Sequence, residues 1–178
     1  MVEWSKFRFP MATLLGIFFA CFGVFIFGKF TYVGLDLYDN VFSLMSSLDT
    51  AAEGFYQLFG SGFMVDLFEE FSPQNLQGTT RAAVFRSEMV WPAVITWIMT
   101  GFIAGAIVKG WKRGVYVTVL IVFLVFIGWV ICGFFAGEDM SSIYRDNFTT
   151  RMSELFTAIV FVIPAGLIAG LITGPYEE

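Results

Sequence analysis

The segment PAGLIAGLITG, residues 164–174, closes the last apolar stretch of the chain and carries three glycines spaced four residues apart. Residues four apart lie on one face of an α-helix. In lipid, helices associate by close van der Waals packing, and small residues collect where two backbones approach. The spacing therefore predicts a helix-packing face of the glycine-zipper type, against a helix of this chain or of another chain. Its predicted packing residues are Gly166, Gly170, Gly174, Ala165 and Ala169.

This segment belongs to one of four stretches that are long and apolar enough to span a bilayer, which takes about 20 residues. The stretches cover residues 11–32, 90–108, 115–136 and 155–173, and none contains a carboxylate. Only 14% of the chain is charged, against about 25% in soluble domains. The mean hydropathy is +0.76. The sequence therefore predicts an all-α, polytopic membrane protein, a four-helix bundle that forms a single membrane domain over residues 1–178.

The glycine pattern occurs a second time. RSEMVWPAVITWIMTGFIAGAI (residues 86–107) aligns without gaps with RMSELFTAIVFVIPAGLIAGLI (residues 151–172). The alignment places Gly101 over Gly166 and Gly105 over Gly170, so Gly101 and Gly105 are also predicted packing residues. The match indicates either a duplicated helical hairpin or convergence, because small-residue helix faces resemble one another.

The long connection over residues 33–89 has helical periodicity of its own. Loops of that length without structure are uncommon. We expect two or three short amphipathic helices that cap the bundle outside the cytoplasm. The first would present an apolar face of Leu37, Val41, Leu44, Met45 and Leu48. The cap either packs on its own bundle or docks a partner, and its candidate docking residues are Phe55, Phe59, Phe63, Leu67, Phe68 and Phe71.

Basic residues predict the orientation of the chain. The short segments WSKFRF (residues 4–9) and KGWKRG (residues 109–114) are dense in Lys and Arg. Such loops stay in the cytoplasm, so we expect both termini to be cytoplasmic and the protein to lie in the plasma membrane. Asn147-Phe148-Thr149 on the opposite side is a glycosylation sequon, whose use depends on the organism.

The chain lacks the residues that several kinds of chemistry require. The chain has no histidine, which excludes a histidine-ligated haem, a histidine metal site and a Ser-His-Asp triad made by this chain alone. Cys21 and Cys132 both lie in apolar segments, as buried cysteines do. We expect no catalytic residue, no metal ligand, no cofactor and no nucleic-acid partner.

Two functions fit this pattern. The first is a non-catalytic integral membrane subunit that contacts lipid and packs against other integral membrane subunits of a larger complex. The second is a homo-oligomeric pore or channel, in which Thr96 and Thr100 would add polar lining. The topology of four spans with a larger first outer loop is similar to that of the claudins, a family of adhesion and barrier proteins. That family's first-loop Trp and Cys pair have no counterpart in residues 33–89.

Overall fold

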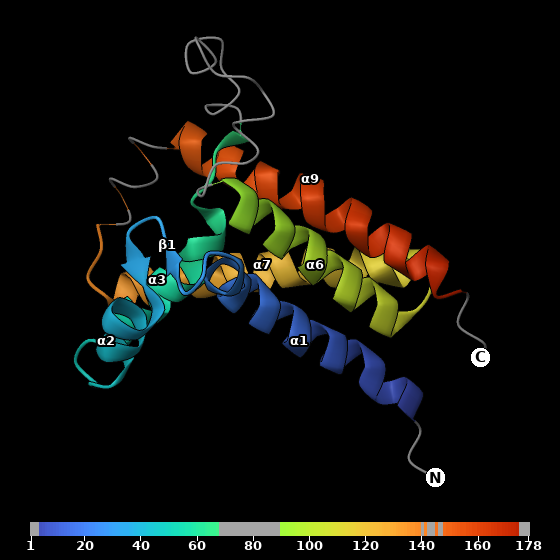
Figure 1. The fold of residues 1–178 in the computed structure, drawn as a ribbon, viewed down its shortest axis with the longest axis horizontal. Coiled ribbons are helices and arrows are strands. Elements are labelled where there is room, and N and C mark those ends of the chain that lie inside the picture. Colours follow the sequence, from blue (N-terminus) through green and yellow to red (C-terminus); the bar gives the residue numbers. More distant parts are fainter. Residues whose placement is uncertain (1–3, 68–89, 140, 142–144, 146–147, 175–178) are drawn as a thin grey trace.

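The computed structural model describes residues 4–67, 90–139, 141, 145 and 148–174. Four long helices form a bundle (Figure 1), and each is apolar enough to cross a membrane. They are α1 (Trp4–Phe27), α6 (Val90–Val108), α7 (Trp111–Phe135) and α9 (Phe148–Ile172). The prediction of an all-α, multi-pass membrane protein is therefore confirmed. Phe68, Phe71, Asn147 and the first four residues of the aligned segment 86–107 lie outside the described residues.

The helix ends differ from the predicted spans. The first span was expected to reach residue 32, but α1 ends at Phe27. Lys29 and Phe30 follow with φ of 59° and 70°, a left-handed conformation that an α-helix cannot continue. At the other end of the bundle, Gly110 has φ of 89° and directly precedes α7. Helix α9 begins at Phe148, so it includes a polar first part that the hydropathy of residues 155–173 did not mark.

The helices pack so that α6 and α7 lie between α1 and α9. Both α6 and α7 contact each of the outer two helices. Helices α6 and α9 run side by side in the same direction, as Figure 1 shows. The start of α1 and the end of α9 lie at one end of the bundle, and the cap lies at the other. The described parts of the two aligned segments, which lie in α6 and α9, are therefore neighbours in space.

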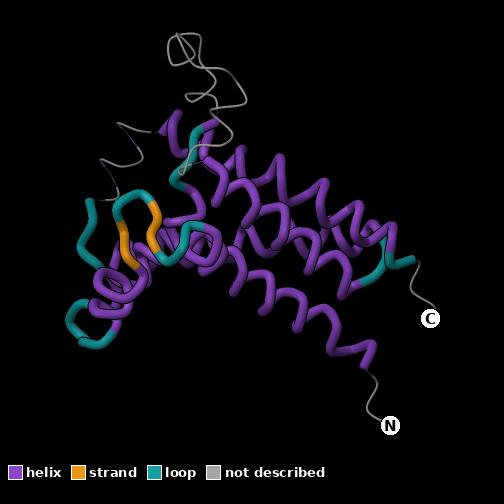
Figure 2. Tube along the Cα trace, in the orientation of Figure 1, coloured by secondary structure: helices purple, strands orange, loops and turns teal. Residues whose placement is uncertain are grey.

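The cap is built from short pieces (Figure 2). Its elements are the antiparallel strands β1 (Thr31–Tyr32) and β2 (Leu35–Asp36), the π-helix η1 (Leu37–Phe42), α2 (Ser43–Met45), α3 (Ala51–Gly60) and the 3-10 helix η2 (Ser61–Phe63). Short helices were predicted here, and η1 and α2 follow one another without a break over residues 37–45. Leu37 and Val41 are buried and Leu44 and Met45 are half-buried, so Leu48 is the one member of the predicted apolar face that does not belong to it. The Asp36 carboxylate accepts hydrogen bonds from the Tyr38 and Asp39 amides at 2.8 and 3.0 Å. This cap starts η1, and Leu48 lies in the turn after α2 with 97% of its surface exposed.

Candidate packing site and outer cap

The glycines of α6 lie directly against the backbone of α9. A Cβ added to Gly101 would lie 3.0 Å from the Ala165 Cβ and 3.1 Å from the Gly166 amide nitrogen. A Cβ added to Gly105 would lie 2.9 Å from the Gly166 Cα. Each added Cβ would also lie less than 3.0 Å from a carbonyl oxygen of α9, that of Val162 for Gly101 and that of Gly166 for Gly105, and real Cβ atoms essentially never come so close. The two helices can therefore reach this separation only because these positions lack side chains.

Helix α7 joins the same contact. A Cβ on Gly166 would lie 3.1 Å from the Gly114 carbonyl oxygen, and one on Gly170 would lie 2.7 Å from the Gly110 carbonyl oxygen. The Gly110 amide also donates a 3.0 Å hydrogen bond to the Gly170 carbonyl oxygen. This bond gives a partner to a carbonyl in the last turn of α9, where helical partners run out. Three helices of one chain thus meet around Gly166 and Gly170.

The predicted packing residues divide unevenly. Gly101, Gly105, Gly166 and Gly170 lie in the contact, and Ala165 and Ala169 are buried beside it. Gly174 does not continue the strip. It lies beyond the end of α9 with φ of 83°, and an added Cβ there would meet nothing within 4 Å. Gly114 belongs to the contact but was not selected from the sequence, because it lies on α7, outside the two aligned segments and one residue before the predicted third span.

The candidate docking residues of the cap face in different directions. Phe63 is buried, whereas Phe59 and Leu67 are partly buried and pack against the core. Phe55 is exposed, and Phe68 and Phe71 lie outside the described residues. Of the described candidates, only Phe55 is therefore available to a partner. The others fasten the cap to the bundle.

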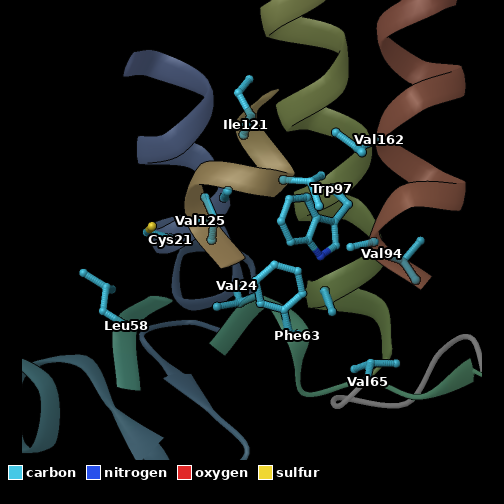
Figure 3. Close-up of a cluster of buried hydrophobic side chains, with 14 of the residues drawn as sticks. Cys21, Val24, Leu58, Phe63, Val65, Val94, Trp97, Ile121, Val125 and Val162 are labelled. Carbon is cyan, nitrogen blue, oxygen red and sulfur yellow. The ribbon is translucent and has the colours of Figure 1, made fainter. Parts of the chain in front are cut away.

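Phe63 and Trp97 form the centre of that attachment (Figure 3). Their ring centroids are 5.2 Å apart, and Phe63 also packs edge-on against Phe126 at 6.0 Å. The buried Trp97 indole donates a 2.8 Å hydrogen bond from Nε1 to the Gly62 carbonyl oxygen. A buried tryptophan satisfies its N–H in this way, and here the acceptor belongs to η2. The indole therefore links α6 to the cap.

Trp97→Phe is expected to loosen the cap. The ring would remain, but the buried Gly62 carbonyl would lose its donor, which costs about 1–3 kcal/mol. The measurement is the rate of limited proteolysis within residues 31–63, together with the thermal unfolding midpoint. Trp91→Phe is the matched control, because Trp91 lies on the same helix and is exposed. Equal rates for the two variants would contradict the link.

Polar side chains gather where α9 meets the cap. The Arg151 guanidinium donates to both carboxylate oxygens of Glu154, at 3.0 and 2.7 Å. Only 7% of Glu154 is exposed. The guanidinium also lies 5.5 Å from the Trp129 ring, and Ser153 donates a hydrogen bond to Asp66 of the cap. The hydropathy pattern did not predict this cluster, because Glu154 comes one residue before the predicted fourth span.

Tyr32 of β1 belongs to the same region. Burial raises the pKa of its phenol well above the usual value, and the nearby Glu154 carboxylate raises that pKa further. The phenol therefore stays neutral at physiological pH. Within the described residues, no group of three or more His, Cys, Asp or Glu side chains lies close enough to hold a metal ion. The arrangement is that of a packed polar cluster.

Known proteins do not indicate a function for this chain. A comparison with protein-family models, curated proteins and solved structures finds no match. We therefore argue function from the contacts that the bundle makes and from the surfaces that it leaves exposed.

Proposed function

We propose that the protein is a non-catalytic integral membrane subunit that docks to another integral membrane protein through aromatic side chains on α1 and the cap. The observation that carries the proposal is a continuous row of rings, which we call the aromatic stripe. Its members are Phe18, Phe22, Phe42, Tyr38 and Phe30. Neighbouring ring centroids along it are 4.9, 6.3, 5.8 and 5.8 Å apart.

The stripe runs beyond the part of the chain that lipid chains would cover. The apolar part of α1 has 21 residues, which is about 30 Å of helix and matches the hydrocarbon core. Phe30, Tyr38 and Phe42 follow that helix and are exposed. Aromatic side chains dominate the binding energy of many protein interfaces. A partner that itself crosses the membrane would cover both halves of the stripe.

In this proposal the small-residue faces do not bind the partner. The glycines of α6, α7 and α9 contact helices of the same chain, so they make the bundle compact. The charge pattern supports an orientation with both termini cytoplasmic, because the basic turn between α6 and α7 lies at the end of the bundle where α1 begins and α9 ends. A plasma-membrane location fits this orientation.

The alternative of a homo-oligomeric pore needs a polar lumen. Thr96 and Thr100 were its candidate lining, and both are fully buried within the single bundle. The Thr96 hydroxyl donates to the Pro92 carbonyl oxygen at 2.6 Å, and the side chain faces Gly23 of α1. These contacts favour the subunit over the pore.

Tyr38→Glu is expected to weaken the docking about 30-fold, the loss typical of an interface hot spot. Tyr38 is 58% exposed, so the fold should tolerate the change. The measurement is the size and composition of the complex after mild detergent extraction from the native membrane. Different proteins should co-migrate with the wild-type chain at fixed stoichiometry and be lost from Tyr38→Glu.

Ser47→Glu provides the matched control. It adds the same charge at an exposed cap position outside the stripe, and the complex should survive it. A ring of identical chains would overturn the subunit proposal in favour of the pore. Equal retention of the other proteins by Tyr38→Glu and Ser47→Glu would overturn the role of the stripe.

A further inference from the structure

A cavity of about 310 Å³ lies where the turn between α6 and α7 meets the end of α9. Three of its lining residues are cations, namely Lys109, Lys112 and Arg113, and among the described residues that line it none is acidic. Trp111 and Leu171 supply an apolar part of the wall. The volume is in the range of small-molecule sites. The lining therefore combines positive charge with apolar surface at one end of the membrane-spanning bundle.

We propose that this cavity binds an anionic phosphate group, supplied by the headgroup of an acidic phospholipid or by free phosphate. Basic pockets between transmembrane helices bind acidic headgroups, because cations there meet the charge of the lipid at the membrane surface. Trp111 lies at the boundary where indoles prefer the headgroup level. Leu171 is exposed near the end of α9, in the place where it would meet the upper part of an acyl chain.

The cavity is held in shape by the backbone. The Gly110 amide bonds to the Gly170 carbonyl oxygen at 3.0 Å, which fixes the basic turn against α9. Lys112 Nζ lies 5.5 Å from the centroid of the Trp111 ring, so one cation is already placed beside the apolar wall. The 25-residue helix α7 begins at Trp111, and the positive end of its dipole adds to the attraction of an anion.

The test measures how strongly the protein prefers an acidic lipid to a zwitterionic one. The full chain is placed in bilayers that contain brominated phosphatidylglycerol or brominated phosphatidylcholine, and quenching of Trp111 is isolated by subtracting the signal of a Trp111→Phe variant. Each cation near an anionic headgroup contributes a factor of about five. Lys112→Gln/Arg113→Gln should therefore lower the preference for phosphatidylglycerol roughly 25-fold.

Two further arms identify the source of the phosphate. Lys29→Gln/Arg145→Gln removes two cations at the other end of the bundle and should leave the preference unchanged. If excess inorganic phosphate does not relieve the quenching, the ligand is the lipid headgroup. If phosphate relieves it in the wild type but has no effect in Lys112→Gln/Arg113→Gln, the site takes free phosphate. Two outcomes would overturn the proposal. In the first, both lipids quench equally and phosphate has no effect. In the second, Lys112→Gln/Arg113→Gln keeps the wild-type preference for phosphatidylglycerol.

Discussion

Gly105→Leu is expected to force α6 away from α9 and to lower the free energy of unfolding by more than about 3 kcal/mol. A Cβ at this position would lie 2.9 Å from both the Cα and the carbonyl carbon of Gly166. These are backbone atoms in the middle of a packed helix, so they cannot turn aside as a side chain can. The measurement is thermal unfolding of the purified protein, combined with the fraction that elutes as one species after extraction.

Two alanine variants separate the contact from helix propensity. Gly105→Ala and Gly128→Ala each gain about 1 kcal/mol of helix propensity. The three atoms nearest to a Cβ on Gly128 all belong to the Phe59 ring, at 3.1 to 3.3 Å, and that partly buried side chain can shift. Gly128→Ala should therefore stay close to the wild-type stability while Gly105→Ala falls below it. A Gly105→Ala protein as stable as the wild type would contradict a backbone contact at this position.

Arg151→Met is expected to destabilise the protein by about 3 kcal/mol, because it leaves the Glu154 carboxylate buried without its guanidinium. The value lies at the low end for a broken buried pair, since 28% of the Arg151 side chain is exposed to solvent. The variant also loses the contact of the guanidinium with the Trp129 ring. Chemical unfolding in mixed micelles at neutral pH measures the change.

The double variant Arg151→Met/Glu154→Gln tests the cause. Replacing both members of a buried ion pair costs much less than removing one, because no buried charge remains. The double variant should therefore recover most of the stability that Arg151→Met loses. If it is no more stable than Arg151→Met, the loss comes from packing on Trp129 and not from the buried carboxylate.

Much of the fold could be predicted from the sequence. Four apolar stretches predicted four helices, and the structure has them with shifted ends. The ends were missed where backbone conformation decides them, as at Lys29 and Phe30, because hydropathy contains no signal for a left-handed turn. The cap shows the same limit, since α2 ends at Met45, and Leu48, which the apolar spacing placed on the buried face, lies exposed in the turn that follows.

The candidate site was predictable only in part. Four-residue spacing within the predicted spans selected Gly101, Gly105, Gly166 and Gly170, but Gly114 lies just before the predicted span 115–136 and was missed, although it also meets Gly166. The aromatic stripe was also missed. Phe18 and Phe22 are separated from Tyr38 and Phe42 by the end of α1 and the hairpin, so no pattern along the chain joins them.

The sequence by itself determined that the protein spans a membrane and which helix faces are small. Burial in lipid depends on the apolar content of one segment, and the periodicity of one helix defines its own faces. The tertiary structure alone decided what those faces meet. Gly166 packs against Gly105 and Gly114, and Phe63 points inward at Trp97 instead of outward. Such contacts depend on how several helices cross, and therefore on distances between residues that are far apart along the chain.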